Sequence, residues 1–250
     1  MKKNYTHLTV CLDRSGSMAS MAKDVIGGFN TLVADQIKVE GEATMTVAKF
    51  DTQYEIISDF MRVSDVILLD SSNFQPRGST ALLDAMGKTM NDVRERINQM
   101  PEDEKPSKAL FVFMTDGEEN ASREYNRDRV FEMISDLKNE SENDESAIQW
   151  DFVFIGANQD AIQAGGSYGI RRDASLTYTA NGDGATRAFC SLSDSITSYR
   201  GASKGVTLSF SDEDRKEQEE IANKTSKRFD NCIPYSMSDL VDTSDKTKKS

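Results

Sequence analysis

The chain of 250 residues is long enough for one substantial α/β domain and a shorter additional segment. Its 42 acidic residues outnumber its 30 basic ones, and the resulting net charge of −12 argues against nonspecific binding of nucleic acids. The three cysteines are widely spaced, which argues against a disulfide framework and against a Cys-x-x-Cys metal site. Residues 1–10 lack the apolar core of a signal peptide, and no stretch of sequence is apolar for the length of a membrane span. We therefore expect a cytoplasmic protein that binds neither nucleic acid nor membrane.

Hydrophobic periodicity predicts strands that alternate with amphipathic helices. The predicted strands cover residues 7–12, 43–51, 54–60, 108–115, 150–156 and 175–179, and the second and third of them form a hairpin. The predicted helices cover residues 22–37, 82–97, 130–137, 159–166 and 185–199. This alternation predicts an α/β fold with a doubly wound, mostly parallel sheet, helices on both faces and one antiparallel strand at an edge.

The composition changes near residue 205. We expect one domain over residues 1–204 and a charged C-terminal tail over 205–250 that is partly helical, around 211–223, or disordered. The apolar cluster of this tail, residues 232–241, is expected to fold back onto the domain or to bind a partner. A second polar segment, residues 138–147, is predicted to be a surface loop.

The first predicted strand ends in a pattern of oxygen-bearing side chains. Asp13, Ser15 and Ser17 occupy alternate positions directly after the apolar run, so one carboxylate and two hydroxyl groups can face a single small cation. Oxygen ligands without histidine or cysteine favour Mg²⁺, Mn²⁺ or Ca²⁺ over Zn²⁺. Serine and aspartate are also common in loops and helix caps, so this segment alone does not define a metal site.

Two later segments complete the pattern. Thr80 follows Gly78-Ser79 and opens an amphipathic helix, and Thr115-Asp116-Gly117 ends another apolar strand. The chain therefore resembles the von Willebrand factor type A domain over roughly residues 5–200. The resemblance is carried by three motifs in this order: Asp-x-Ser-x-Ser, a helix-opening threonine and a strand-ending Thr-Asp-Gly. The resemblance implies the Rossmann-like fold of that family.

The resemblance also implies a metal-ion-dependent adhesion site (MIDAS). In this family the matching residues form the site, so Ser15, Ser17 and Thr80 are expected to supply oxygen ligands to Mg²⁺, or to Mn²⁺ or Ca²⁺. Asp13 and Asp116 are expected to bind the cation directly or through water. Because ligands of open α/β sheets bind at the carboxyl ends of the strands, these five residues should meet at one edge of the sheet.

The residues beside the expected ligands are predicted to lie outside the ligand set. Arg14 is a cation next to a cation site, so we expect its side chain to point away from the metal. Glu118, Glu119 and Asn120 follow Asp116 and are predicted to be a solvated loop, with added negative potential near the site as the alternative.

The resemblance implies a binding module that captures an acidic side chain of a partner protein with the bound cation, in the assembly or regulation of an intracellular complex. The alternatives are a metal-assisted hydrolase that uses Asp13 or Asp116 with a metal-bound water, and a regulatory subunit of an ATPase-linked, chelatase-type machine. The one histidine, His7, is predicted at the start of the first strand, too far from the expected site for a Ser-His-Asp hydrolase. We therefore expect no enzymatic activity, and the sequence specifies neither the partner nor the oligomeric state.

Overall fold

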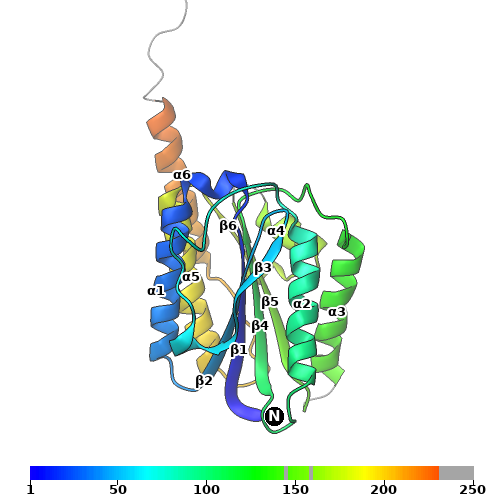
Figure 1. Ribbon diagram of the computed structural model, residues 1–250. Coiled ribbons are helices and arrows are strands. Elements are labelled where there is room, and N and C mark those ends of the chain that lie inside the picture. The colour runs from blue at the N-terminus through cyan, green and yellow to red at the C-terminus, as the bar shows by residue number, and fades with distance from the viewer. Residues whose placement is uncertain (144–145, 158–159, 231–250) are drawn as a thin grey trace, which may run out of the picture.

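The computed structural model describes residues 1–143, 146–157 and 160–230, which form one six-stranded sheet. The strand order is β3-β2-β1-β4-β5-β6, and neighbouring strands are parallel except for the antiparallel pair β2 and β3 at one edge (Figure 1). The strands are β1 (Lys2–Asp13), β2 (Glu42–Phe50), β3 (Tyr54–Arg62), β4 (Pro106–Thr115), β5 (Gln149–Ala157) and β6 (Ser175–Tyr178). The predicted fold class is confirmed.

Helices cover both faces of the sheet, with α1 and α5 on one face and α2 and α3 on the other (Figure 1). The helices are α1 (Ala22–Lys38), α2 (Leu82–Asn98), α3 (Arg127–Asn143), α4 (Ala161–Ser167), α5 (Gly182–Gly201) and α6 (Asp212–Asp230), with short 3₁₀ turns η1 (Gly16–Ser20), η2 (Val63–Asp65) and η3 (Arg172–Ala174). Among the described residues, no helix combines the length and the apolar composition needed to cross a membrane.

Most elements lie within about three residues of their predicted bounds, but three extend well beyond them. Strand β1 begins at Lys2 because its polar first residues pair with neighbouring strands, which sequence periodicity does not reveal. Helix α3 continues to Asn143, through much of the segment predicted to be a loop, since polar residues such as Lys and Glu are good helix formers. Helix α6 is longer than predicted and packs against α5 and β6, and Leu208 and Phe210 just before it belong to the core. The apolar cluster 232–241 lies outside the described residues.

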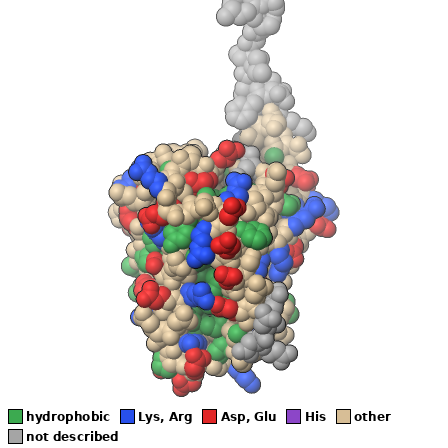
Figure 2. Space-filling view, turned by 90° about the vertical axis from the view of Figure 1, so that its right-hand side faces the viewer, with side chains coloured by type: hydrophobic (Ala, Val, Ile, Leu, Met, Phe, Trp, Pro, Cys, Tyr) green, Lys and Arg blue, Asp and Glu red, His purple; other side chains and the backbone are tan. Residues whose placement is uncertain are grey.

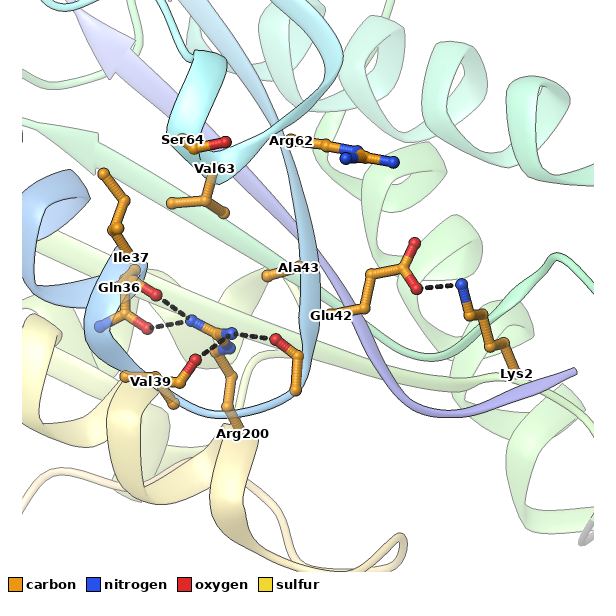
Figure 3. Close-up of a pocket in the computed structure, with 11 residues that line it drawn as sticks. Lys2, Gln36, Ile37, Val39, Glu42, Ala43, Arg62, Val63, Ser64 and Arg200 are labelled. Carbon is orange, nitrogen blue, oxygen red and sulfur yellow. Dashed lines mark hydrogen bonds and ion pairs between the residues drawn. The ribbon is translucent and has the colours of Figure 1, made fainter.

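Two buried cations cap helices at the edge of the sheet where β1 and β2 begin. The Arg200 guanidinium donates hydrogen bonds to the carbonyl oxygens of Gln36 (2.6 Å) and Val39 (3.2 Å) at the end of α1, beside a pocket of about 370 Å³ (Figure 3). The Lys108 ammonium donates to the carbonyl oxygen of Tyr199 (2.6 Å) near the end of α5. Both cations satisfy carbonyl groups that a helix end leaves without partners, and they interact favourably with the helix dipole.

The surface over α2 and α3 carries interspersed acidic and basic side chains (Figure 2). Lys88 pairs with Glu124 at 2.7 Å, and Arg94 on α2 pairs with Glu140 on α3. Charges of opposite sign therefore balance one another locally on this face.

Helices α1 and α5 approach closely at Gly28. A Cβ atom at this position would lie 2.5 Å from Cδ2 of the buried Phe189 on α5, whereas a Cβ atom at the neighbouring Gly27 would meet nothing within 4 Å. The low helix propensity of glycine is thus offset at Gly28 by close packing, and no such contact offsets it at Gly27.

These two glycines allow a matched test of the packing. We expect Gly28→Ala to lower the free energy of unfolding by about 1–3 kcal/mol, because the added methyl group overpacks the contact with Phe189. The control Gly27→Ala should raise it by up to about 1 kcal/mol through helix propensity. Urea unfolding of both variants measures the difference, and equal effects would contradict the packing argument.

Candidate metal centre

The residues of the predicted metal site meet at the carboxyl edge of the sheet, at the top of Figure 1. Strand β1 ends at Asp13, and its neighbour β4 ends at Thr115, directly before Asp116. The segment that carries Thr80 is brought to the same edge by backbone hydrogen bonds, among them that from Gly16 N to the carbonyl oxygen of Gly78 (3.1 Å). Segments almost 100 residues apart in the sequence thus lie side by side.

Hydrogen bonds connect four of the five predicted residues. The hydroxyl oxygens of Ser15 and Ser17 are 3.1 Å apart, and Ser17 Oγ donates to Asp116 Oδ1 at 2.7 Å. Asp13 Oδ1 accepts from the backbone N–H of Ser15 (2.6 Å), and Asp13 Oδ2 accepts from Thr115 Oγ1 (2.5 Å). Both oxygens of the Asp13 carboxylate are therefore already fixed by the protein.

The fifth residue, Thr80, reaches the others across Gly117. A Cβ atom at Gly117 would lie 3.0 Å from Thr80 Oγ1 and 3.7 Å from Ser17 Oγ, so a larger residue would fill the space between the two hydroxyl groups. The backbone N–H of Thr80 donates to Asn120 Oδ1 at 3.0 Å, which holds the segment in place. The structure therefore brings all five sequence-predicted residues together.

The donor set fits a small hard cation. Its five side chains offer only oxygen atoms, from three hydroxyl groups and two carboxylates, and these are the donors that Mg²⁺ and Mn²⁺ prefer. Within the described part of the chain, no three His, Cys, Asp or Glu side chains come together as a metal site, so a cation here depends on the hydroxyl groups. Ser15, Ser17 and Thr80, with the two aspartates, would hold Mg²⁺ or Mn²⁺.

The electrostatics of the site also favour a cation. Burial of Asp13 raises the pKa of its carboxyl group to about 6, and the nearby carboxylate of Asp116 contributes in the same direction. Burial likewise raises the pKa of Asp116. Asp13 and Asp116 are close together, and the protein disfavours the ionised form of each. A bound cation would stabilise both carboxylates.

The site rests on supporting residues whose roles the sequence did not reveal. Thr115 holds Asp13, whereas the sequence indicated it only as the first residue of the strand-ending Thr-Asp-Gly motif. Glu119 accepts from the backbone N–H of Leu83 in the first turn of α2 (3.0 Å), and Asn120 binds Thr80. Residues 119 and 120 thus fix the start of α2 instead of forming only a solvated loop.

Arg14 lies next to the site but its charge is directed elsewhere. Its guanidinium forms ion pairs with Asp51, at an Nε–Oδ2 distance of 3.0 Å, and with Glu55. These partners belong to the β2–β3 hairpin, so the side chain points away from the candidate ligands, as the sequence led us to expect.

Comparisons with known proteins identify the fold. No family model matches the chain, and no curated protein matches it in sequence. A crystal form of proximal thread matrix protein 1 from the mussel byssus matches with a TM-score of 0.52 at 14% identity, over 77% of this chain and 46% of the mussel chain. The structure of the mussel protein with a zinc-occupied MIDAS motif matches with a TM-score of 0.51 at 13% identity, over 77% and 46% of the two chains.

A von Willebrand factor type A protein from Catenulispora acidiphila matches with a TM-score of 0.47 at 14% identity, over 77% of this chain and 42% of that chain. This chain spans less than half the length of the mussel protein. Its six-stranded sheet, with one antiparallel edge strand and helices on both faces, is a Rossmann-like α/β fold that it shares with the mussel protein.

A divalent cation should stabilise the folded protein. At 100 times the dissociation constant, Mg²⁺ or Mn²⁺ bound only to the folded state adds about 2.7 kcal/mol, which for a chain of this size raises the Tm by roughly 5–10 °C. Asp13→Ala should abolish this response and retain the fold, because the residue lies at the end of its strand. The gain in Tm should shrink at pH 5, where protons compete for Asp13. Thermal unfolding with and without cation measures these shifts, and an equal rise in Asp13→Ala would place the cation elsewhere.

Proposed function

We propose that this protein is a divalent-cation-dependent binding module that captures an acidic side chain of a partner protein. The observation that carries the proposal is the convergence of Ser15, Ser17, Thr80, Asp13 and Asp116 at one exposed edge of the sheet. The fold shared with the mussel byssus protein, whose MIDAS motif holds zinc in one structure, supports it.

The charge of the donor set favours an acidic partner. Three donors are neutral hydroxyl groups, and both oxygens of the Asp13 carboxylate already accept hydrogen bonds from the protein. Asp116 is the remaining carboxylate, and one of its oxygens accepts from Ser17. When bound, Mg²⁺ would supply an incompletely neutralised positive charge that attracts a carboxylate oxygen of the partner.

The shape of the site supports binding over catalysis. Ser17 is exposed and Asp116 is half-buried, so a partner surface can reach these two groups, whereas Asp13, Ser15 and Thr80 are buried. The pockets of about 370, 480, 540 and 800 Å³ in the described part of the chain are lined by residues other than the five candidate ligands. A hydrolase would in addition need a general base within reach of the substrate.

His7 does not supply that base. Its ring is fully buried in β1, where it stacks on Phe60 with the ring centroids 3.6 Å apart and contacts Thr44 Oγ1 through Nδ1. Burial lowers the pKa of His7 to about 3, so it remains neutral at physiological pH.

The free thiols of Cys11 and Cys190 fit a reducing compartment, in keeping with the proposed intracellular role.

Partner capture by the full chain tests the function. Immobilised wild-type protein should retain its partner in Mg²⁺ and release it in EDTA, and Asp13→Ala should not retain it. Thr80→Ala should weaken binding by roughly tenfold or more, because it removes one ligand oxygen but leaves both carboxylates. Replacing the acidic residue of the captured partner by its amide should have a similar effect.

Capture that is unchanged by EDTA and by both substitutions would show that the partner uses another surface. An ATPase among the captured proteins would favour the role of a regulatory subunit in a chelatase-type machine, which uses the same metal site.

A further inference from the structure

A buried carboxylate outside the candidate ligand set contacts both loops that carry the hydroxyl ligands. Asp51 follows β2, in the turn that leads to β3, and is 1% exposed. One of the loops follows β1 and carries Ser15 and Ser17, and the other precedes α2 and carries Thr80. Ser17 lies in the short 3₁₀ turn η1, and the segment that carries Thr80 has no helix or strand between η2 and α2.

Asp51 contacts the first loop through Arg14. This residue stands between Asp13 and Ser15, and its Nε atom lies 3.0 Å from Asp51 Oδ2. The Arg14 side chain is 4% exposed, so its charge depends on a carboxylate partner for compensation. Its backbone N–H donates to the carbonyl oxygen of Phe50, directly before Asp51 (2.7 Å).

Asp51 contacts the second loop at two points. Arg77 Nε donates to Asp51 Oδ2 at 2.8 Å, and the backbone N–H of Ala81, next to Thr80, donates to the carbonyl oxygen of Asp51 at 3.0 Å. Between these points Gly78 has a φ of +67° and passes so near the turn that a Cβ atom there would lie 3.6 Å from Asp51 Cβ. The second loop is therefore packed directly against Asp51.

The two loops also contact each other at this point. The backbone N–H of Arg77 donates to the carbonyl oxygen of Arg14 at 2.8 Å. Both guanidinium groups thus converge on one oxygen of Asp51, and its other oxygen accepts from the backbone N–H of Gln53 at 2.7 Å. Burial by itself would raise the pKa of Asp51, but the hydrogen bonds from Arg77 and Gln53 and the charge of Arg14 hold that pKa below its ordinary value.

We propose that Asp51 is a positioning residue of the metal site, which sets the distance between the Ser15 and Ser17 hydroxyl groups and that of Thr80. The inference rests on the proposed function, because it assigns Asp51 a role in cation binding. Asp51 contacts Arg14 and Ala81, which are next to candidate ligands on the two loops. A shift of either loop would therefore change the distance between the Ser15 and Ser17 hydroxyl groups and that of Thr80. Groups that orient the ligands of a metal typically change its affinity by about 10–100-fold when they are replaced.

The same contacts could serve folding alone, and Arg77 distinguishes the two roles. Its side chain is 53% exposed, so its removal should cost little folding stability. If Asp51 and Arg77 position the second loop, Arg77→Ala should nevertheless weaken cation binding. A matched control is Arg94→Ala, which removes another half-exposed arginine from an ion pair on the outer face of α2.

Calorimetric titration of the full chain with Mn²⁺ tests the inference. Asp51→Asn should weaken Mn²⁺ binding by about 10–100-fold, Arg77→Ala should weaken it by a smaller factor, and Arg94→Ala should leave it unchanged. Arg77 also donates to Glu55 Oε1 at 2.9 Å, so the double variant tests which contact matters: if Arg77 acts through Asp51, it should bind about as weakly as Asp51→Asn alone. Lys108→Met, a substitution of a buried cation at the opposite edge of the sheet, should lower the Tm and leave Mn²⁺ affinity unchanged.

The inference would be overturned if Asp51→Asn and Arg77→Ala both bound Mn²⁺ with wild-type affinity while Asp13→Ala did not bind it. The proposed function would still stand in that case. Absence of Mn²⁺ binding by the wild-type protein would overturn both. If Asp51→Asn does not fold, Arg77→Ala alone decides between positioning and a purely structural role.

Discussion

The parallel pairing of β1 with β2 on one side and β4 on the other is the constraint on which the candidate site depends. Because β1 and β4 run in the same direction in register, with Leu12 opposite Met114, their carboxyl ends deliver Asp13 and Asp116 to the same edge. The parallel β2 brings Asp51 there as well, opposite the loop that follows Asp13. A shift of β1 by one residue would turn the ligands of its loop to the other face of the sheet.

Burial and charge give this edge its chemistry. Asp13 lies at the end of a strand that is covered on both faces, so its carboxylate loses much of its hydration and relies on Thr115 and the Ser15 backbone for hydrogen bonds. Ser17, by contrast, is exposed. The proposed site therefore has a buried side that fixes the ligands and an open side on which a partner can bind.

The sequence predicted those features that repeat or that form a local motif. Apolar runs predicted the strands, and the alternate spacing of Asp13, Ser15 and Ser17 in one loop indicated that their oxygen atoms can face a single cation. Thr80 and Asp116 were implied by the resemblance to the von Willebrand factor type A domain. The start of β1 was missed because Lys2 is held by pairing with Pro106 of β4, and Tyr5 and Thr6 pair with β2, whereas periodicity does not report pairing.

The residues around the ligands could not be predicted for a related reason. Asp51, Arg77 and Asn120 are single polar residues in turns, where such residues are common for many reasons. Their contacts join segments that are 26 and 40 residues apart in the chain. Only the fold shows that these side chains meet.

The position of a bound cation tests the central claim most directly. A crystal structure of the protein grown with Mn²⁺, with anomalous scattering recorded at the manganese edge, locates the cation without reference to its ligands. The account predicts one strong peak at about 2.0–2.2 Å from the hydroxyl oxygens of Ser15, Ser17 and Thr80. A peak elsewhere on the molecule, or none at this edge at saturating Mn²⁺, would contradict it.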